Sequence, residues 1–479
     1  MPSNYKRRDF LKDTTLLGML PFVKSFPFIE AADIKKYGNV IDAPADPALW
    51  SKYREELLNW RIQARKALNY DDAAYKNPAF KWTQSNYSCL FLFMYDQDFF
   101  DPAKNVYTTA KVIERGKKEF GKYDSVVLWH AYPRIGFDER NQFDYYRDMP
   151  GGLAGLYKVT EEFHKEGIKV FINYNPWDTG TRREGKTDID GLADIVAAIN
   201  ADGIFLDTLK NAAFDFRNKL DSIKPGIVVE GEIAAELEYL PTHHLSWAQE
   251  FGDKYIPGIL RNKWYEPRHI QHQISRWSHD HSVELHQAWM NGSGIMIWEN
   301  VFGQWLPWHE RDKSLLRTIL PIQRRYSELF NSESLVPFIE TNIDGVFANL
   351  WQKDGLKLYT LVNRHQHEIA GKLVTINDDK GNYFDVVAGG VAKINRSGKK
   401  IIIEGRIPAR GIGCIVSVKG NIDEKFLSEM REIQASYNYE AVIPVNESNL
   451  KKVKPTKLSK LNSGMIEIKP SIVRQVTKI

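Results

Sequence analysis

Two short hydrophobic runs of this chain end in carboxylates, and one helix-sized segment separates them. The first run, 203–207, ends in Asp207; the second, 226–232, carries Glu230 and Glu232. Both runs are typical of buried strands of a parallel sheet, joined by a crossover helix. Consecutive strands of a barrel end at the same rim, which is where barrel enzymes hold their catalytic groups. Two carboxylates facing each other there could cleave a glycosidic bond.

The three carboxylates suggest different roles. Asp207 closes an apolar strand, where an unpaired charge is costly, so we expect a nucleophile; the alternative is a capping or salt-bridged aspartate. Glu230 and Glu232 point to the same side of their strand, because side chains alternate. One of them is expected to be the general acid/base. Glu232 is preferred, since Gly231 leaves room for a substrate, and the other glutamate would orient it or bind a hydroxyl.

Aromatic and polar side chains also follow the other predicted strands. Trp and Tyr rings stack on sugar rings, and carboxylates and amides bind hydroxyls, so this mixture suits a carbohydrate site. Asp178 fits loop structure equally well, and Lys210 could be an ordinary surface lysine. The expected substrate-binding residues are Trp129, His130, Tyr132, Asn173, Asn175, Trp177, Asp178, Lys210, Trp247, Glu250, Trp298 and Glu299.

The alternation of strands and helices predicts the scaffold. About eight strand–helix steps over 85–334 are the repeat of a (β/α)8 TIM barrel, an α/β fold. The rival doubly wound sheet lacks a Gly-x-Gly-x-x-Gly motif after its first strand. The predicted strands are 89–95, 125–130, 169–175, 203–207, 226–232, 245–251, 269–277 and 294–299.

The barrel is flanked by other segments. Residues 33–84 form a helical lead-in, with an amphipathic helix over 46–70. Short alternating strands between Asp-Gly and Gly-Asn turns predict an antiparallel β-sandwich over 335–419. Residues 420–479 form a polar tail or linker with one candidate helix at 423–433.

Composition excludes several classes of function. The 479 residues are 43% hydrophobic and carry a net charge of +4, which is too balanced to indicate a nucleic-acid partner. Cys89 and Cys414 lie far apart and have no metal-ligand spacing, so we expect no metal and no cofactor. The oligomeric state is open.

The amino terminus predicts export. Residues 6–12, Lys-Arg-Arg-Asp-Phe-Leu-Lys, resemble the bacterial twin-arginine motif, and the apolar stretch after them is too short to span a membrane. We therefore expect a signal peptide over 1–32 and a periplasmic or extracellular protein; the alternative is a frayed basic terminus.

The strand ending in Asp207, the strand ending in Glu232 and the following β-sandwich resemble the retaining α-glycosidase barrels. These are the α-amylase-like and endo-α-N-acetylgalactosaminidase-like families and, more loosely, the melibiase clan. The resemblance implies that Asp207 is the nucleophile and Glu232 the acid/base. The chain departs from the α-amylase pattern, because Phe205 replaces the arginine two positions before the nucleophile, and in the melibiase group Glu250 would take the acid position.

These observations predict an exported glycoside hydrolase that acts on an oligo- or polysaccharide by a retaining mechanism, with α linkages favoured by the resemblance. The alternative is a non-catalytic carbohydrate-binding protein on a degenerate barrel, which would bind sugars without turnover.

Overall fold

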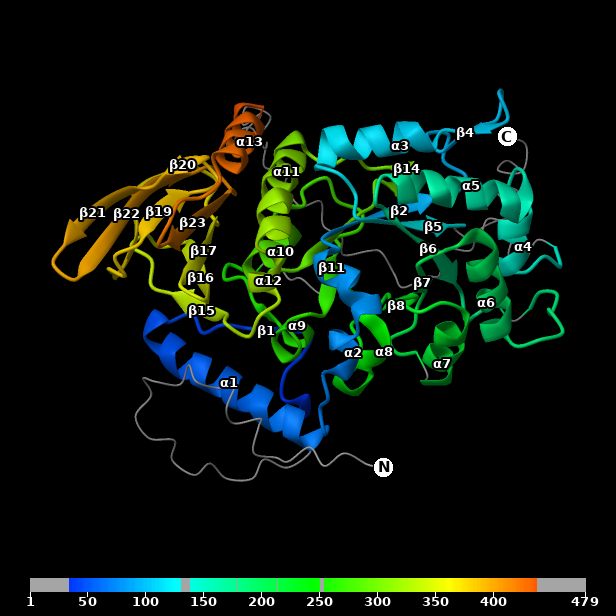
Figure 1. Ribbon diagram of the computed structural model, residues 1–479, viewed down its shortest axis with the longest axis horizontal. Helices are drawn as coiled ribbons and strands as arrows, with labels where there is room; N and C mark the ends of the chain where they lie inside the picture. The colour runs from blue at the N-terminus through cyan, green and yellow to red at the C-terminus, as the bar shows by residue number, and fades with distance from the viewer. Residues whose placement is uncertain (1–33, 131–137, 179, 213, 250–253, 437–479) are drawn as a thin grey trace, which may run out of the picture. The chain divides into compact units, whose positions relative to one another are not determined.

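The computed structural model describes residues 34–130, 138–178, 180–212, 214–249 and 254–436 (Figure 1). The expected signal peptide and the end of the chain lie outside the described residues. So do two expected binding residues, Tyr132 and Glu250. Among the described helices, none is long and apolar enough to cross a membrane.

Eight parallel strands form a closed barrel. They are β2 (Ser88–Phe93), β5 (Ser125–Trp129), β6 (Lys169–Tyr174), β7 (Gly203–Leu206), β8 (Val228–Gly231), β9 (His244–Ala248), β11 (Ile270–Gln273) and β12 (Gly294–Ile297). They follow one another around the barrel in chain order, and β12 pairs with β2 to close it. Each predicted strand overlaps one of them, so the predicted TIM barrel is confirmed.

Helices connect successive strands and cover the barrel, as Figure 1 shows for α3, α5 and α6. Neighbouring connections pack on one another, notably α5 on α6 and α10 on α11. Their buried apolar faces and the strands form one core. The helices are α3 (Thr109–Arg115), α4 (Gln142–Arg147), α5 (Gly152–Lys165), α6 (Asp188–Ile199), α7 (Phe214–Ile223), α8 (Leu240–His243), α9 (Arg261–Tyr265), α10 (Ser282–Asn291) and α11 (Glu310–Arg325).

Short elements decorate the barrel. Three two-stranded sheets pair β1 (Val40–Ile41) with β10 (Ile259–Leu260), β3 (Phe100–Asp101) with β4 (Val106–Tyr107), and β13 (Asn300–Val301) with β14 (Gln304–Trp305). Two short helices, α2 (Ala73–Lys76) and α12 (Ser327–Phe330), lie outside the strand connections. The β13–β14 hairpin directly follows the last barrel strand, so it lies at the C-terminal rim.

After the barrel the chain forms two antiparallel sheets. The larger has the order β15-β16-β17-β23-β19-β20 and the smaller β18-β22-β21. Residues of both sheets share a second hydrophobic core, which confirms the predicted β-sandwich. A two-residue Asp354-Gly355 turn joins β16 to β17, and both turn residues have positive φ, as the predicted Asp-Gly turn requires. The strands are β15 (Val336–Ile339), β16 (Val346–Lys353), β17 (Leu356–Asn363), β18 (Ile369–Asn377), β19 (Asn382–Asp385), β20 (Gly390–Val391), β21 (Lys393–Ser397), β22 (Lys400–Ile407) and β23 (Ile412–Val418), followed by α13 (Glu424–Ala435).

The amino-terminal helix α1 (Trp50–Ala67) contacts both the barrel and the β-sandwich. The Arg54 guanidinium donates to the backbone carbonyl of Phe338 in β15 at 2.9 Å. In the last turn of the helix, Arg65 donates to the carbonyl of Tyr265 in α9, also at 2.9 Å. The helix therefore fastens the lead-in to segments that come some 200 or more residues later in the chain.

Candidate active site

Asp207 and Glu232 lie side by side at the C-terminal rim of the barrel. Leu206 pairs in register with Gly231, and these are the residues directly before the two carboxylates. The backbone N–H of Glu232 donates to the carbonyl of Leu206 at 3.1 Å, so the two strands stay paired up to the carboxylates. The rim thus brings together the two residues that the sequence paired.

The register also fixes where the two side chains point. Phe205 pairs with Glu230, and the Phe205 ring stacks on Trp247 inside the barrel, with ring centroids 4.4 Å apart. Side chains alternate along a strand, so residues two positions further on point to the same side. Asp207 and Glu232 come two positions after Phe205 and Glu230, one residue past the strand ends, and the alternation predicts that both side chains point toward the barrel axis.

Glu232 is held from several directions. The backbone N–H of Thr208, the residue after Asp207, donates to Glu232 Oε2 at 2.7 Å. Arg276, after β11, forms an ion pair with Glu232 Oε1. Gln249, after β9, donates to the backbone carbonyl of Glu232 at 2.9 Å. The side chain of Glu232 remains 12% exposed, so the carboxylate is positioned and still reaches the surface.

Below this layer, aromatic rings fill the barrel. Phe91 lies 4.9 Å from Trp129 and 4.8 Å from Trp298, between ring centroids, and Trp247 packs against Phe91 as well. Trp129, Trp247 and Trp298 are all buried, so in this structure they form the floor beneath the carboxylates. The guanidinium of Arg276 lies over the rings of Trp247 and Trp298, at 5.9 and 5.5 Å from their centroids. These three tryptophans, expected to stack on sugars, pack edge-on or tilted against other rings of the barrel interior.

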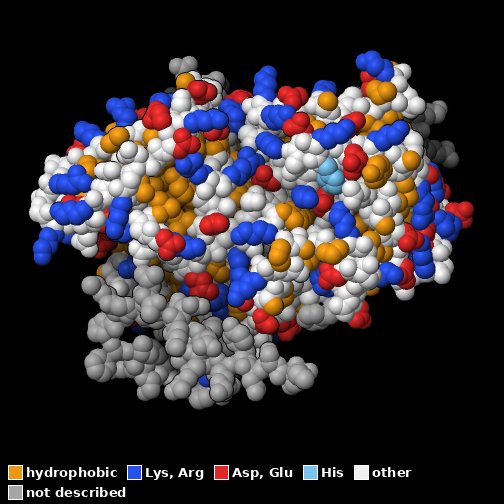
Figure 2. Space-filling view, in the orientation of Figure 1, with side chains coloured by type: hydrophobic (Ala, Val, Ile, Leu, Met, Phe, Trp, Pro, Cys, Tyr) orange, Lys and Arg blue, Asp and Glu red, His pale blue; other side chains and the backbone are white. Residues whose placement is uncertain are grey.

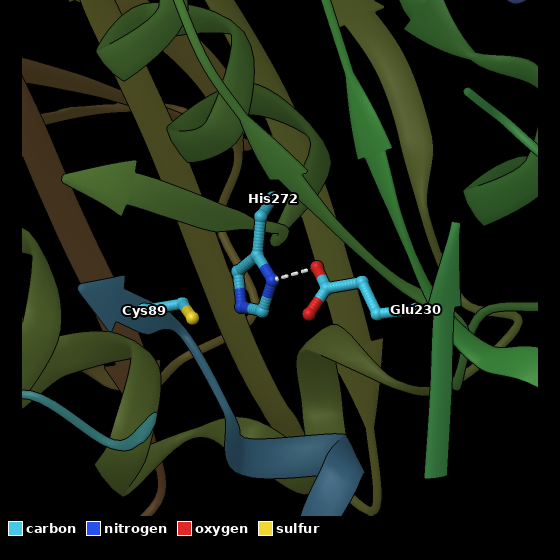
Figure 3. A group of neighbouring side chains, drawn as sticks. All are labelled: Cys89, Glu230 and His272. Atoms are coloured by element: carbon cyan, nitrogen blue, oxygen red, sulfur yellow. Dashed lines mark hydrogen bonds and ion pairs between the residues drawn. The ribbon is translucent and has the colours of Figure 1, made fainter. Parts of the chain in front are cut away.

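Glu230 is fully buried and bonds to His272 rather than facing the rim (Figure 3). Its Oε1 lies 2.5 Å from His272 Nδ1, while His272 Nε2 lies 3.0 Å from the backbone carbonyl of Asn86. Burial alone would lower the pKa of His272, but the Glu230 carboxylate and these hydrogen bonds outweigh burial and raise it. Glu230 lies two residues below Glu232, about 6.6 Å deeper along the strand, which favours an ion-pair role within the core.

The Glu230–His272 pair lies next to the thiol of Cys89, and the three residues could together offer ligands to a metal (Figure 3). Their ligand atoms lie within 4.8 Å of one another, and all three residues are buried. Both His272 nitrogens face oxygen acceptors, however, which fits an imidazolium with two N–H donors. Burial raises the pKa of the Cys89 thiol well above its usual range, so it is not a ready thiolate ligand. The cluster is better described as a buried ion pair beside a thiol.

His130, Asn173 and Asn175 form a buried polar group at the ends of β5 and β6. Asn173 donates to the side-chain oxygen of Asn175 at 2.6 Å, and its amide nitrogen lies 3.4 Å from His130 Nε2. Gln142 of α4 brackets the backbone N–H and carbonyl of Asn175 with two hydrogen bonds. Burial lowers the pKa of His130 to about 3, so this imidazole is neutral. These residues shape the rim from below.

Asp178 and Lys210 make loop contacts. Asp178 accepts from the backbone N–H of Gln142 at 2.8 Å and from the Thr181 hydroxyl at 2.6 Å, which fixes the loop after β6. Lys210 forms an ion pair with Glu236 at 3.1 Å. These contacts agree with the alternatives stated above, in which Asp178 belongs to loop structure and Lys210 is an ordinary surface lysine.

Glu299 anchors the β13–β14 hairpin. Its carboxylate forms an ion pair with Arg115 of α3 and accepts from the backbone N–H of Trp308 at 2.9 Å. Because the side chain of Glu299 is buried, these contacts fix the loop after β12 rather than meeting a substrate directly.

Some of the exposed aromatic side chains at the rim were expected from the sequence and others were not. Trp177 was expected there and is 40% exposed. Trp277, which directly follows Arg276, and Phe302, at the tip of the β13–β14 hairpin, were not singled out from the sequence, and they are 56% and 46% exposed. Arg276 was missed as well. The available signal was a basic and aromatic pair right after the seventh barrel strand.

No protein-family model and no curated protein sequence matches this chain. Solved structures are similar to it, among them an alpha-amylase from Lactobacillus plantarum, with 13% identity and a TM-score of 0.47 over 70% of this chain and 100% of that one. An alpha-amylase from Geobacillus thermoleovorans complexed with acarbose gives 13% identity and a TM-score of 0.46, covering 71% and 99%. A candidate alpha-galactosidase/melibiase from Bacteroides fragilis gives 12% and 0.46, covering 70% and 79%. The chain is thus similar, at low identity, to structures of glycoside hydrolases of the α-amylase and α-galactosidase kinds.

Proposed function

We propose that this protein is a glycoside hydrolase whose nucleophile is Asp207 and whose general acid/base is Glu232. One observation carries the proposal: the two carboxylates directly follow the ends of neighbouring barrel strands, which stay paired up to them at the C-terminal rim. That rim is where barrel enzymes place their catalytic groups. Glycosidic bond cleavage needs two carboxyl groups on either side of the scissile bond.

The strand geometry supports a retaining mechanism. Neighbouring strands lie about 4.8 Å apart. Retaining glycosidases hold their carboxyl groups about 5–5.5 Å apart, whereas inverting enzymes need about 6.5–9.5 Å to admit a water. Glu232 Oε2 lies 2.7 Å from the backbone nitrogen that directly follows Asp207, which keeps the two acids close.

In the proposed reaction, Asp207 attacks the anomeric carbon while Glu232 donates its proton to the leaving glycosidic oxygen. The C–O bond to the leaving group breaks, and a covalent glycosyl ester forms on Asp207. Glu232 then takes a proton from a water, whose oxygen attacks the anomeric carbon and releases Asp207. Thr208 and Arg276 would orient Glu232 through both steps.

The substrate class and the location of the protein are part of the proposal. The aromatic and amide-rich rim suits an oligo- or polysaccharide, and the resemblance to retaining α-glycosidases favours α linkages. The twin-arginine-like amino terminus supports export to the periplasm or beyond.

Trapping the intermediate would test the mechanism. The protein would be incubated with 5-fluoro-α-glucosyl fluoride and 5-fluoro-α-galactosyl fluoride, and its peptides analysed by mass spectrometry. We expect one fluorosugar on Asp207 and none in Asp207→Asn. Glu232→Gln should hydrolyse glycans at least about 100-fold more slowly and regain turnover of a sugar fluoride when azide is added.

Glu238→Gln is the matched control, because Glu238 is exposed and follows the same strand; its activity should equal that of the unaltered protein. A label on another carboxylate, or full activity in Asp207→Asn, would refute the assignment of the nucleophile.

A second function is favoured by the contacts of Glu232. Arg276 pairs with one of its carboxylate oxygens and the Thr208 N–H donates to the other, so the protein itself already holds both oxygens. A non-catalytic carbohydrate-binding protein could keep such a fixed carboxylate. It would retain soluble glycans without producing reducing ends, and Glu232→Gln would weaken that binding.

A further inference from the structure

Two exposed aromatic residues at the rim have an unusual backbone conformation. Trp277 has φ of 61° and Phe302 has φ of 53°, in the left-handed region that bulky side chains rarely occupy. Such strain persists where the surrounding structure enforces it, and it is concentrated at functional sites. The two residues lie 25 positions apart, on separate loops.

Phe302 occupies a turn position of its hairpin that ordinarily favours asparagine. Phe302 and Gly303 form the two-residue turn between β13 and β14, and both have positive φ. A turn of this kind favours Asn-Gly, because asparagine tolerates the left-handed region. A phenylalanine in that place costs stability, and it places a large ring at the tip of the hairpin.

The two rings stack on each other in parallel. Their centroids lie 6.0 Å apart and their planes differ by 10°. Phe302 also packs on Trp298 and Trp129 of the aromatic floor, at 5.5 and 5.0 Å between centroids. A continuous aromatic wall therefore rises from the floor through Phe302 to Trp277, whose side chain is 56% exposed.

The loop that carries Trp277 is tied to the site on one side and to the barrel on the other. The preceding residue, Arg276, forms the ion pair with Glu232. Two residues after Trp277, His279 Nδ1 lies 2.7 Å from the carbonyl of Pro307, and its own carbonyl accepts from the backbone N–H of His309 at 3.0 Å. Trp277 thus directly follows the arginine that pairs with Glu232, and its ring packs on Phe302.

We propose that Trp277, backed by Phe302, is a stacking platform for the sugar unit attached to the leaving oxygen. This rests on the proposed function, in which Glu232 protonates that oxygen. The platform makes the substrate a glycan of at least two sugar units rather than a simple glycoside. A flat ring covered on one face and exposed on the other matches the C–H face of a pyranose.

Trp277→Asn is the decisive variant, because asparagine tolerates the left-handed backbone that tryptophan strains. Two pairs of substrates distinguish binding of the leaving sugar from bond cleavage itself. They are maltotriose with α-glucosyl fluoride, and melibiose with α-galactosyl fluoride. The fluorides have no sugar on the leaving side. We expect kcat/KM for the glycan to fall at least tenfold and kcat/KM for the fluoride to change less than twofold.

The melting temperature of Trp277→Asn distinguishes a sugar-binding role of Trp277 from a purely structural one. It should stay the same or rise in Trp277→Asn, because backbone strain is relieved, whereas a purely structural tryptophan would lower it. Trp277→Tyr, which keeps a ring, should recover part of the glycan activity. Tyr157→Ala removes an exposed aromatic residue from α5 and serves as the control. Equal losses on glycan and fluoride, or unchanged glycan kinetics, would overturn the platform.

If the unaltered protein turns over none of these four substrates, the proposed hydrolase function fails. The platform is then tested by measuring whether the protein binds a glycan. The protein is run in native gels that contain amylopectin or galactomannan, and binding is measured as slower migration. Retardation that disappears in Trp277→Asn and persists in Tyr157→Ala would support the platform in a binding protein. Equal migration with and without glycan would refute it.

Discussion

Replacing Glu230 by glutamine should change how the free energy of unfolding depends on pH. In the native protein, the raised pKa of His272 reflects its carboxylate partner, which outweighs burial. Two other buried histidines without such a partner, His269 and His286, have pKa values well below the usual range because of burial. In Glu230→Gln, His272 should join them and become neutral.

The sign of the effect follows from proton binding. An unfolded histidine titrates near pH 6.5. Between about pH 6.5 and the raised pKa of His272, the native folded state holds one proton more than the unfolded state, so its stability falls by about 1.4 kcal/mol per pH unit. In Glu230→Gln the folded pKa lies below 6.5, so its stability rises by about the same amount per unit up to about pH 6.5.

The two slopes combine into one prediction. The destabilisation caused by Glu230→Gln should shrink by about 1.4 kcal/mol per pH unit from pH 5.5 up to the raised pKa of His272. At the acid end it should reach about 3–5 kcal/mol, the usual cost of removing one partner of a buried ion pair. Urea unfolding followed by fluorescence at pH 5.5, 6.5 and 7.5 measures it.

The double variant Glu230→Gln/His272→Gln is the control. It has no ionisable group at this position, so the rise in stability between pH 5.5 and 6.5 seen in Glu230→Gln should be absent. A loss of stability in Glu230→Gln that is the same at all three pH values would refute the ion-pair interpretation of Figure 3.

Three further changes test other parts of the structure. In Gly203→Ala the new Cβ would lie 2.3 Å from the phenylalanine ring on β6, so a loss of about 1–3 kcal/mol is expected from overpacking; an unchanged melting temperature would contradict it. Glu299→Gln removes the buried one of the two carboxylate partners of Arg115, the other being Glu119, and should cost about 2 kcal/mol, measured by urea unfolding, with the exposed Glu310→Gln as control. Arg276→Met keeps the side-chain stem but releases Glu232, so turnover of a sugar fluoride should fall about tenfold; a variant with full turnover would exclude a positioning role for this arginine.

The sequence predicted the barrel and the paired carboxylates because both depend on local patterns. A hydrophobic run such as 203–206 marks a buried strand, and chain order then decides which strands are neighbours. The placement of Asp207 beside Glu232 follows from those two facts. The contact between Arg276 and Glu232 does not, because it joins residues 44 positions apart, and the basic and aromatic pair after β11 does not indicate which carboxylate it meets.

The aromatic residues show a second limit of prediction. Trp129, Trp247 and Trp298 lie at strand ends, as expected, but the alternation of each strand turns all three inward. The interior of an eight-stranded barrel is just wide enough for side chains to fill it. Three indole rings and Phe91 occupy that space as a floor, a property of the closed barrel as a whole.

The contacts of α1 have a consequence for the order of synthesis. Its partner Phe338 is 284 residues further along than Arg54, so a ribosome adding about 5–20 residues per second needs tens of seconds to make it. Through that time the apolar side of α1, including Trp50, has no final partner in the β-sandwich. The helix is therefore among the first segments synthesised and among the last to be docked, and a chain that ends before β15 would leave this surface uncovered.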